Sequence, residues 1–332
     1  MTYLAFDLDG TIYNANRYLW ELLCPFDVAD RCRKLPVLMA MVTEPSDELR
    51  QRLEVAYKIF STRLAEAETS SPIGLFRPGI FRVLGKALQL KKAGFVKGVI
   101  MYTNNSSRIL VKIAVEVINR VLGEPLFDDV LDRLHPLRLK DPVTGEGPSL
   151  KTWVELKKLL VESNTSAPAS LAPKDVMFFD DGLHADLMSA LGPYDNYIKL
   201  DEYKYEWETN YLRDIYLSAL NDSGILSAPV LPEFLEYAKP CSRGILFDNI
   251  DAFLIKCGCG STQMSPKPPL ADTAEGSDKM FRYLSAIEAR GVINNNGNNN
   301  AVTGGKSRKG KGRKRVSTKR NKKKPIRASR VF

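Results

Sequence analysis

Three short apolar segments in this chain of 332 residues each end abruptly in polar residues. They are Tyr3–Phe6, Gly98–Tyr102 and Val176–Phe179. Runs this short and this apolar predict strands of a parallel sheet that is covered on both faces. The sequence also predicts helices before the second and third strands, over 80–92 and 152–162. Strands that alternate with helices indicate an α/β fold, a Rossmann-like parallel sheet with helices on both faces.

Two of these strands end in pairs of carboxylates. Asp7 and Asp9 follow the first strand, and Asp180 and Asp181 follow the third. Side chains at positions i and i+2 of an extended chain point the same way, so Asp7 and Asp9 project together. Ligands of open parallel sheets gather at the carboxyl ends of the strands, where the second pair would face the first. Clustered oxygen ligands suit Mg²⁺, so we expect the four acids to form a Mg²⁺ site. The alternative for each pair is an acidic turn without a metal.

The second strand ends in Thr103 and Asn104, which are suited to binding phosphate. A hydroxyl beside the backbone N–H groups of a helix N-terminus holds phosphate oxygens. Such residues are also common helix N-caps, and the two roles are compatible. Lys151, at the start of the helix before the third strand, would neutralise a nucleophile and a phosphate together. Lys140 is the competing lysine, and only order and spacing along the chain favour Lys151.

The order of these motifs resembles the haloacid dehalogenase superfamily of Asp-dependent phosphohydrolases. The resemblance implies that Asp7 is the nucleophile, which forms an aspartyl-phosphate, and that Asp9 is the general acid and base. It also implies that Thr103 binds the phosphate and that Lys151 stabilises its charge.

The same resemblance implies a Mg²⁺ ion and a division into domains. The ion would be held by the Asp7 carboxylate, the backbone carbonyl of Asp9 and the late acid Asp181, with Asp180 as the partner of Asp181. The resemblance covers about 1–13 and 78–200. We therefore expect a haloacid dehalogenase-like catalytic core formed by residues 1–13 and 78–205.

Residues 14–77 would be an insertion into that core, and their pattern is helical. Ser46 is suited to be an N-cap, and apolar residues recur at helical spacing from Leu49 to Leu64. By the family analogy, this insertion is a small helical cap over the site.

Two narrower resemblances point to different substrates. Arg77-Pro78-Gly79 and the ending Phe178–Asp181 are similar to phosphatases of the NLI-interacting-factor and RNA-polymerase-tail type, which act on phosphoserine in proteins. The helical insertion, Thr103–Asn105 and Leu126–Val130 resemble more closely the capped enzymes that act on small phosphate esters, including nucleotidases. A cap closes a site against a protein segment, so a small phosphorylated metabolite or nucleotide is the favoured substrate. A protein serine phosphatase recruited by a basic tail stays open, and so does a non-catalytic nucleic-acid-binding protein on the same fold.

The basic residues are concentrated at the C-terminal end. Residues 306–332 hold 14 Lys or Arg and no acid, so the formal charge of +9 leaves about −5 for the rest of the chain. An asparagine-rich stretch at 294–300 precedes them, and we expect disorder from about 291 onward because this composition buries little apolar surface. The run 319–325 resembles a nuclear-import patch, and its charges would bind nucleic acid non-specifically. We therefore expect residues 261–332 to be a linker and a disordered basic tail.

Composition bounds the remaining expectations. A hydrophobic content of 44% allows a substantial core and an accessory segment, which we expect at 206–260, packed on the core at the sheet's edge. No apolar run reaches the roughly 18 residues of a membrane span and no leader is evident, so we expect an intracellular protein, nuclear or cytoplasmic, without a membrane partner. Five cysteines argue against a disulfide scaffold and for a reducing compartment. Cys257 and Cys259 would make half a metal site, although incidental cysteines are the simpler interpretation.

Overall fold

The structure is a computed structural model that describes residues 2–14, 17–27, 44–70, 73–138, 150–204, 209–227, 229–238 and 274–300. The chain divides into two compact units, Met1–Gly291 and Val292–Phe332. Of the second unit, the structure describes only 292–300, which are helical. Lys140, Cys257, Cys259 and the basic residues of 306–332 lie outside the described residues, so the expectations for them stay predictions.

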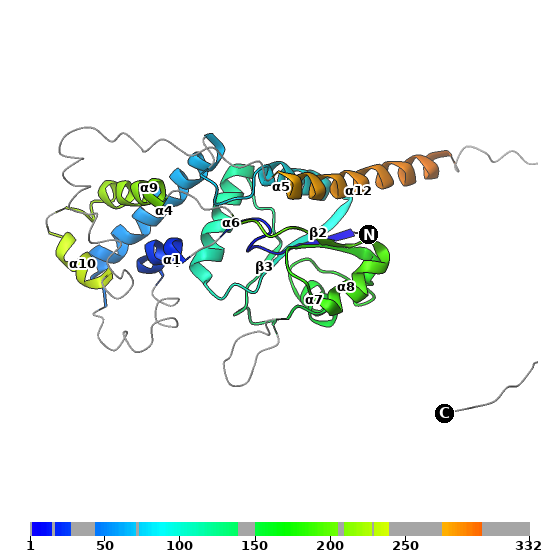
Figure 1. Ribbon diagram of the computed structural model, residues 1–332, viewed down its shortest axis with the longest axis horizontal. Helices are drawn as coiled ribbons and strands as arrows, with labels where there is room; N and C mark the ends of the chain where they lie inside the picture. The colour runs from blue at the N-terminus through cyan, green and yellow to red at the C-terminus, as the bar shows by residue number, and fades with distance from the viewer. Residues whose placement is uncertain are drawn as a thin grey trace, which may run out of the picture. The chain divides into compact units, whose positions relative to one another are not determined.

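A five-stranded parallel sheet forms the framework of the first unit (Figure 1). Its strands are β1 (Thr2–Phe6), β2 (Val96–Tyr102), β3 (Asp129–Leu131), β4 (Val176–Asp180) and β5 (Tyr197–Lys199). They lie in the order β3-β2-β1-β4-β5, so β1 is central, and β2 and β4 flank it. The α/β fold with a Rossmann-like parallel sheet is confirmed, as are the three strands expected from the apolar runs.

Helices cover both faces of the sheet. Alternate residues of β1 join two hydrophobic clusters, Leu4 on one face and Tyr3 on the other. The helices are α5 (Ile80–Lys92) and α6 (Arg108–Leu122) on the first face, and α7 (Trp153–Glu162) and α8 (Ala185–Leu191) on the second. Figure 1 shows α7 and α8 across the sheet from α5 and α6. Because both faces are buried, the strands are apolar along their length and polar only at their ends. Two short 3-10 helices, η2 (Pro173–Asp175) and η3 (Gly192–Tyr194), precede β4 and β5.

Where the structure describes it, the insertion contains helices, as expected. It contains α1 (Arg17–Leu23), η1 (Cys24–Phe26) and the long helix α4 (Asp47–Ser70). The Ser46 hydroxyl accepts a hydrogen bond from the Leu49 amide at 3.2 Å, which confirms the N-cap, and the apolar stripe from Leu49 to Leu64 is buried. The insertion packs on the core through contacts of α4 and α1 with α6.

The helices α9 (Thr209–Asp222) and α10 (Leu231–Ala238) extend the insertion. α9 contacts α4 and α1, and α10 contacts η1. Tyr216 of α9 lies 5.9 Å from Phe60 of α4 and 5.6 Å from Phe26 of η1, measured between ring centroids. For the described residues 209–227 and 229–238, the expectation that the segment 206–260 packs at the sheet's edge is therefore wrong, because the aromatic side chain of Tyr216 finds its partners in the insertion.

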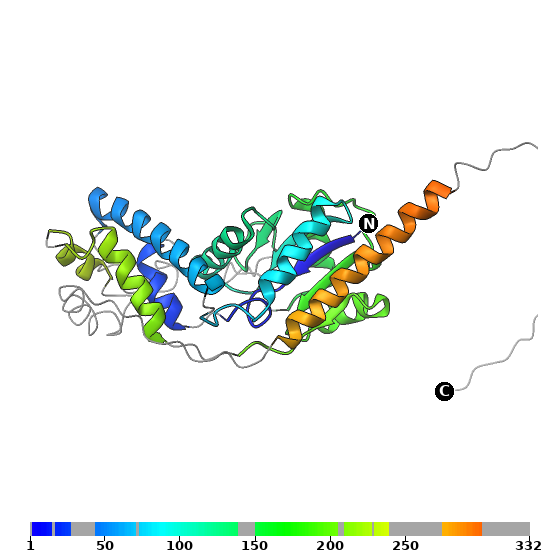
Figure 2. The same cartoon turned by 90° about the horizontal axis from the view of Figure 1, so that it is seen from above.

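The last helix, α12 (Glu275–Asn300), lies in the segment expected to be linker and tail. Met280, Leu284 and Ile287 recur at helical spacing, and all three are buried in the core. Figure 2 shows the part of α12 that belongs to the first unit, 275–291, beside α5, and Lys86 of α5 pairs with Glu288 at 2.5 Å. The expectation of a linker and disordered tail is therefore wrong for Glu275–Asn300, which form a helix, because this apolar stripe buries enough surface to hold the helix on the core.

Two further observations concern composition. In the part of the chain that the structure describes, every helix is too short or too polar to cross a membrane. Cys24 is disulfide-bonded, so the cysteine content does not by itself indicate a reducing compartment.

Candidate active site

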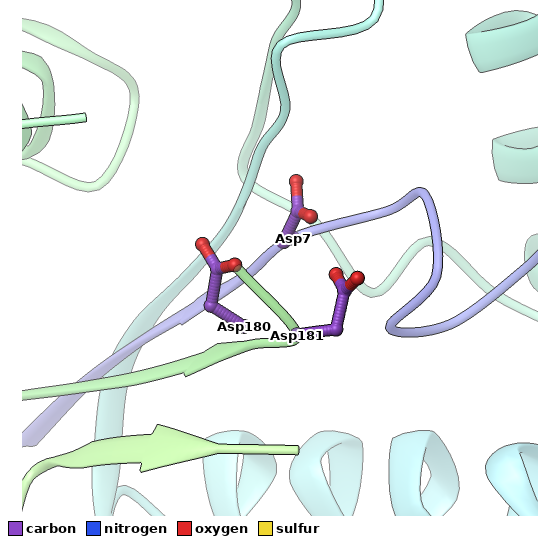
Figure 3. A group of neighbouring side chains, drawn as sticks. All are labelled: Asp7, Asp180 and Asp181. Atoms are coloured by element: carbon purple, nitrogen blue, oxygen red, sulfur yellow. The ribbon is translucent and has the colours of Figure 1, made fainter. Parts of the chain in front are cut away.

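Three carboxylates meet at the carboxyl end of the sheet. Asp7 directly follows β1, Asp180 is the last residue of β4, and Asp181 comes next. Phe6 of β1 lies opposite Phe179 of β4, so the two strands end at the same level. Each acid offers an oxygen within 4.8 Å of the others, and Figure 3 shows the three side chains extending to the same side of the strands. The structure thus brings acids from both pairs together at the carboxyl ends of neighbouring strands.

Lys151 lies between two of these acids. Its Nζ is 2.6 Å from Oδ1 of Asp7 and 2.9 Å from Oδ2 of Asp180, and its side chain is 2% exposed. The rings of Tyr102 and Phe178 flank the ammonium at 5.5 and 5.2 Å from their centroids, which attracts the cation further. Burial works to lower the pKa of Lys151, but the charges of Asp7 and Asp180 prevail and raise it. Lys151 is therefore a charged residue at the place where a site lysine was expected.

Asp9 is turned toward the loop that follows β2. Its carboxylate accepts hydrogen bonds from Nδ2 of Asn105 at 3.1 Å and from Oγ1 of Thr103 at 3.4 Å. Burial raises the pKa of Asp9 to about 6, and these hydrogen bonds oppose the rise. The structure therefore brings Thr103 to the site, whereas the Asp9 side chain stands beside the three-acid cluster and is held by different partners.

Asn104, expected to bind phosphate, has its side chain engaged elsewhere. Its Oδ1 accepts a hydrogen bond from Nη2 of Arg138 at 3.1 Å, and Nη1 of Arg138 donates to the Thr103 carbonyl at 2.7 Å. Arg138 also pairs with Glu155 of α7 at 3.1 Å, and both side chains are fully buried. Arg138 thereby ties the loop after β2 to α7. Sequence reasoning missed Arg138 and Asn105, because nothing marks one buried arginine among 48 basic residues.

Thr11 links the two acidic loops. Its Oγ1 donates to Oδ1 of Asp181 at 2.9 Å and accepts from the Asp181 amide at 2.9 Å. Gly10 has φ of +69° and lies against the same carboxylate, where a Cβ would overlap Oδ2 of Asp181 and lie 2.8 Å from its Cγ. Glycine is required here both by the backbone conformation and by the close approach. A glycine after an acidic residue favours a turn here, but Asp181 as the partner of this turn is identified only by the structure.

His184 supports the second acidic pair. Its Nδ1 accepts a hydrogen bond from the Lys151 amide at 3.3 Å, and its Nε2 lies 3.5 Å from Oδ2 of Asp180. With Nδ1 as the acceptor, the neutral ring carries its proton on Nε2, facing Asp180. Burial lowers the pKa of His184, which favours that neutral form.

The donor atoms of the cluster fit a divalent cation. Burial raises the pKa of Asp7 well above its ordinary value; Lys151 opposes this, while the charges of Asp180 and Asp9 add to it. A further cation beside Asp7 would stabilise its charged form against the cost of burial. The donors of the cluster are all carboxylate oxygens, the set that Mg²⁺ prefers, so both charge and ligand type fit this ion.

Comparison with protein-family models, with curated proteins and with solved structures found no match for this chain. The site itself holds four kinds of group that bear on function. They are a buried carboxylate held by an ammonium, a second carboxylate whose raised pKa suits proton transfer, a threonine hydroxyl, and oxygen ligands for a cation. Such groups can deliver a nucleophile and a proton to a substrate that carries negative charge.

Proposed function

We propose that this protein is a Mg²⁺-dependent phosphomonoester hydrolase of the haloacid dehalogenase type that works through an aspartyl-phosphate on Asp7. The observation that carries the proposal is the contact of Asp7 with Lys151 within a cluster of acids at the end of the central strand. An anionic oxygen next to a fixed positive charge is what attack on a phosphate ester requires. The strand order supports the proposal, since open parallel sheets bind ligands at the carboxyl ends of their central strands.

The chemistry proceeds in two displacements. An oxygen of Asp7 forms a bond to phosphorus, the bond from phosphorus to the ester oxygen breaks, and Asp9 gives the leaving oxygen its proton. A water oxygen then attacks the phosphorus, Asp9 takes the proton of that water, and the bond to Asp7 breaks, which releases inorganic phosphate. Lys151 and the Thr103 hydroxyl stabilise the phosphoryl oxygens throughout. Asp7 and Asp181 would hold Mg²⁺, with Asp180 as the partner of Asp181, and the ion would supply further positive charge.

The favoured substrate is a small phosphomonoester, on the family analogy of the helical insertion. A second candidate, a phosphoserine in a protein, is favoured by exposed apolar side chains near the site. Leu150, Val154 and Leu183 are 66%, 71% and 68% exposed. The segments that carry them are joined by hydrogen bonds, from the Lys151 amide to His184 and from the Trp153 amide to Asp186. Apolar side chains beside the catalytic groups would suit contact with a peptide.

A substrate panel tests the proposal and separates the two candidates. An aryl phosphate, sugar phosphates, nucleoside monophosphates and phosphoserine peptides are incubated with the protein in Mg²⁺ or in EDTA, and released phosphate is measured. We expect Mg²⁺-dependent release, fastest from small esters. Faster release from the peptides would favour the protein phosphatase. The absence of release from every compound would contradict the hydrolase proposal and favour the non-catalytic alternative.

The basic tail is a separate element of the proposal. Its residues lie outside the described part of the chain, and its role in nuclear import or nucleic-acid binding stays a prediction. Truncation after residue 300 should leave the turnover of small esters unchanged and abolish binding to a duplex DNA probe at low salt.

A further inference from the structure

Arg77 connects two loops next to the proposed site. It is buried, and its Nε donates to the Thr11 carbonyl at 2.7 Å. Its Nη2 donates to the Gly10 carbonyl at 2.7 Å and to the Asp201 carbonyl at 2.6 Å. One guanidinium thus joins the loop after β1, which carries Asp9 and Thr11, to the chain that follows β5.

The partners of Arg77 indicate a positioning role. Among the described residues its hydrogen bonds go to backbone carbonyls, and no carboxylate forms an ion pair with it. Burial lowers the pKa of Arg77, and the charge of Asp181 is the first influence that opposes this. A planar guanidinium with several fixed donors suits the bridging of separate carbonyls.

The first turn of α12 covers this guanidinium. A Cβ at Gly276 would overlap Nη1 of Arg77 and lie 2.9 Å from its Cζ. Ser277, the next residue of α12, is fully buried. A Cβ built at Gly79 would lie 3.4 Å from the Cβ of Ser277. Glycine at position 276 therefore permits an approach that any other residue would block, because Arg77 is held by three carbonyls and has little freedom to move away.

A second connection runs from α12 to the same site. Lys279 donates through Nζ to the Lys199 carbonyl at 2.7 Å. Nζ of Lys199 in turn donates to the backbone carbonyl of Asp181 and, at 2.6 Å, to that of Leu200. Two independent chains of contacts thus lead from the first two turns of α12 to the loops that hold Thr11 and Asp181.

We propose that α12 positions the acidic loops of the site through Arg77, and that Gly276 is required for this contact. Arg77 is a positioning residue: it holds the carbonyls of Gly10 and Thr11 and touches no reacting atom. The catalytic consequence rests on the proposed hydrolase function, whereas the effect on the loops does not.

Gly276→Ala separates positioning from simple stability. Alanine is the better helix former, so the substitution favours α12 itself while its Cβ displaces the guanidinium. A misplacement of about 1 Å can reduce turnover roughly 100-fold. At a temperature well below the thermal midpoint of the variant, where the protein is folded, we expect kcat on an aryl phosphate to fall roughly 10- to 100-fold with little change in KM. Gly192→Ala is the matched control, because a Cβ there would meet nothing within 4 Å, and it should leave kcat unchanged.

Hydrogen exchange provides a measurement that does not depend on activity. The amides of the loop 8–13 should exchange faster in Gly276→Ala than in the wild type or in Gly192→Ala. Unchanged exchange of this loop would overturn the inference, whether or not the protein hydrolyses phosphate esters. A wild type that releases no phosphate would instead contradict the proposed function, and faster loop exchange in Gly276→Ala would still support the positioning role.

Arg77→Lys provides a second test. Lysine keeps the positive charge, but a single ammonium cannot reproduce the separate N–H donors with which the guanidinium joins the two loops. We expect faster exchange of loop 8–13 and a reduced kcat in this variant too. Wild-type exchange and turnover in Arg77→Lys would show that only the charge matters and would refute the positioning role.

Discussion

Thr11 and Asp181 form two reciprocal hydrogen bonds although they are 170 positions apart in the chain. The Thr11 hydroxyl donates to the Asp181 carboxylate at 2.9 Å and accepts from the Asp181 amide at 2.9 Å. The hydroxyl therefore fixes both the backbone and the carboxylate of Asp181, and it fastens the loop after β1 to the loop after β4. Loss of this pair should loosen the three-acid cluster from one side.

Thr11→Val tests the pair. Valine keeps the shape of the buried side chain but leaves the amide and the carboxylate of Asp181 without this partner. Groups deprived of a hydrogen bond in this way lower stability by about 1–3 kcal/mol. We expect a loss of that size in urea unfolding, together with at least a tenfold fall in kcat. Thr11→Ser retains the hydroxyl and serves as the control; a stable, fully active Thr11→Val variant would show that the pair is dispensable.

Asp7→Asn should abolish turnover, because an amide cannot form the aspartyl-phosphate. Burial raises the pKa of Asp7, so the folded state disfavours its charged form. A neutral side chain at this position should avoid the free-energy cost of burying that charge. Lys151 retains Asp180 as a partner. We therefore expect an inactive variant that, in EDTA, unfolds at or above the wild-type temperature. Residual turnover near the wild-type rate would remove Asp7 from the role of nucleophile.

Lys151→Met removes the ammonium from two buried carboxylates. Breaking a buried ion pair from one side typically lowers stability by about 3–5 kcal/mol, because it leaves the opposite charge without compensation. We expect a loss of this order in urea unfolding without divalent ions, and loss of turnover. Asp180→Asn in the same chain should recover part of the stability but none of the activity. If Lys151→Met alone unfolds like the wild type, the ammonium does not neutralise these acids.

Mg²⁺ should stabilise the folded protein through the three-acid cluster. A ligand that binds only the folded state at 100 times its Kd adds about 2.7 kcal/mol. We expect Mg²⁺ to raise the thermal midpoint of the wild type and to have little effect on Asp181→Asn. Glu54→Gln, which removes an exposed acid on α4, is the matched control and should respond like the wild type. An equal response of all three proteins would place any bound Mg²⁺ elsewhere.

The sequence alone determined the three central strands and the placement of the acids. Both predictions depend on information within a few neighbouring residues: a short apolar run predicts a buried strand, and the polar residue that ends it marks the carboxyl end. β1, β2 and β4 formed where these runs occur. The meeting of Asp7 with Asp181 then follows from general rules for parallel sheets and needs no knowledge of individual contacts.

Only the tertiary structure decided which residues support those acids. Asn105, and not Asn104, donates to Asp9, although both follow the same strand and differ by one position. Arg77 and Gly276 meet through helix α12, in a segment whose composition had suggested a linker. Such contacts join segments that are remote along the chain, and each depends on the direction of one side chain in a packed interior. Local pattern carries no information about that direction, because the partner that selects it lies elsewhere in the sequence.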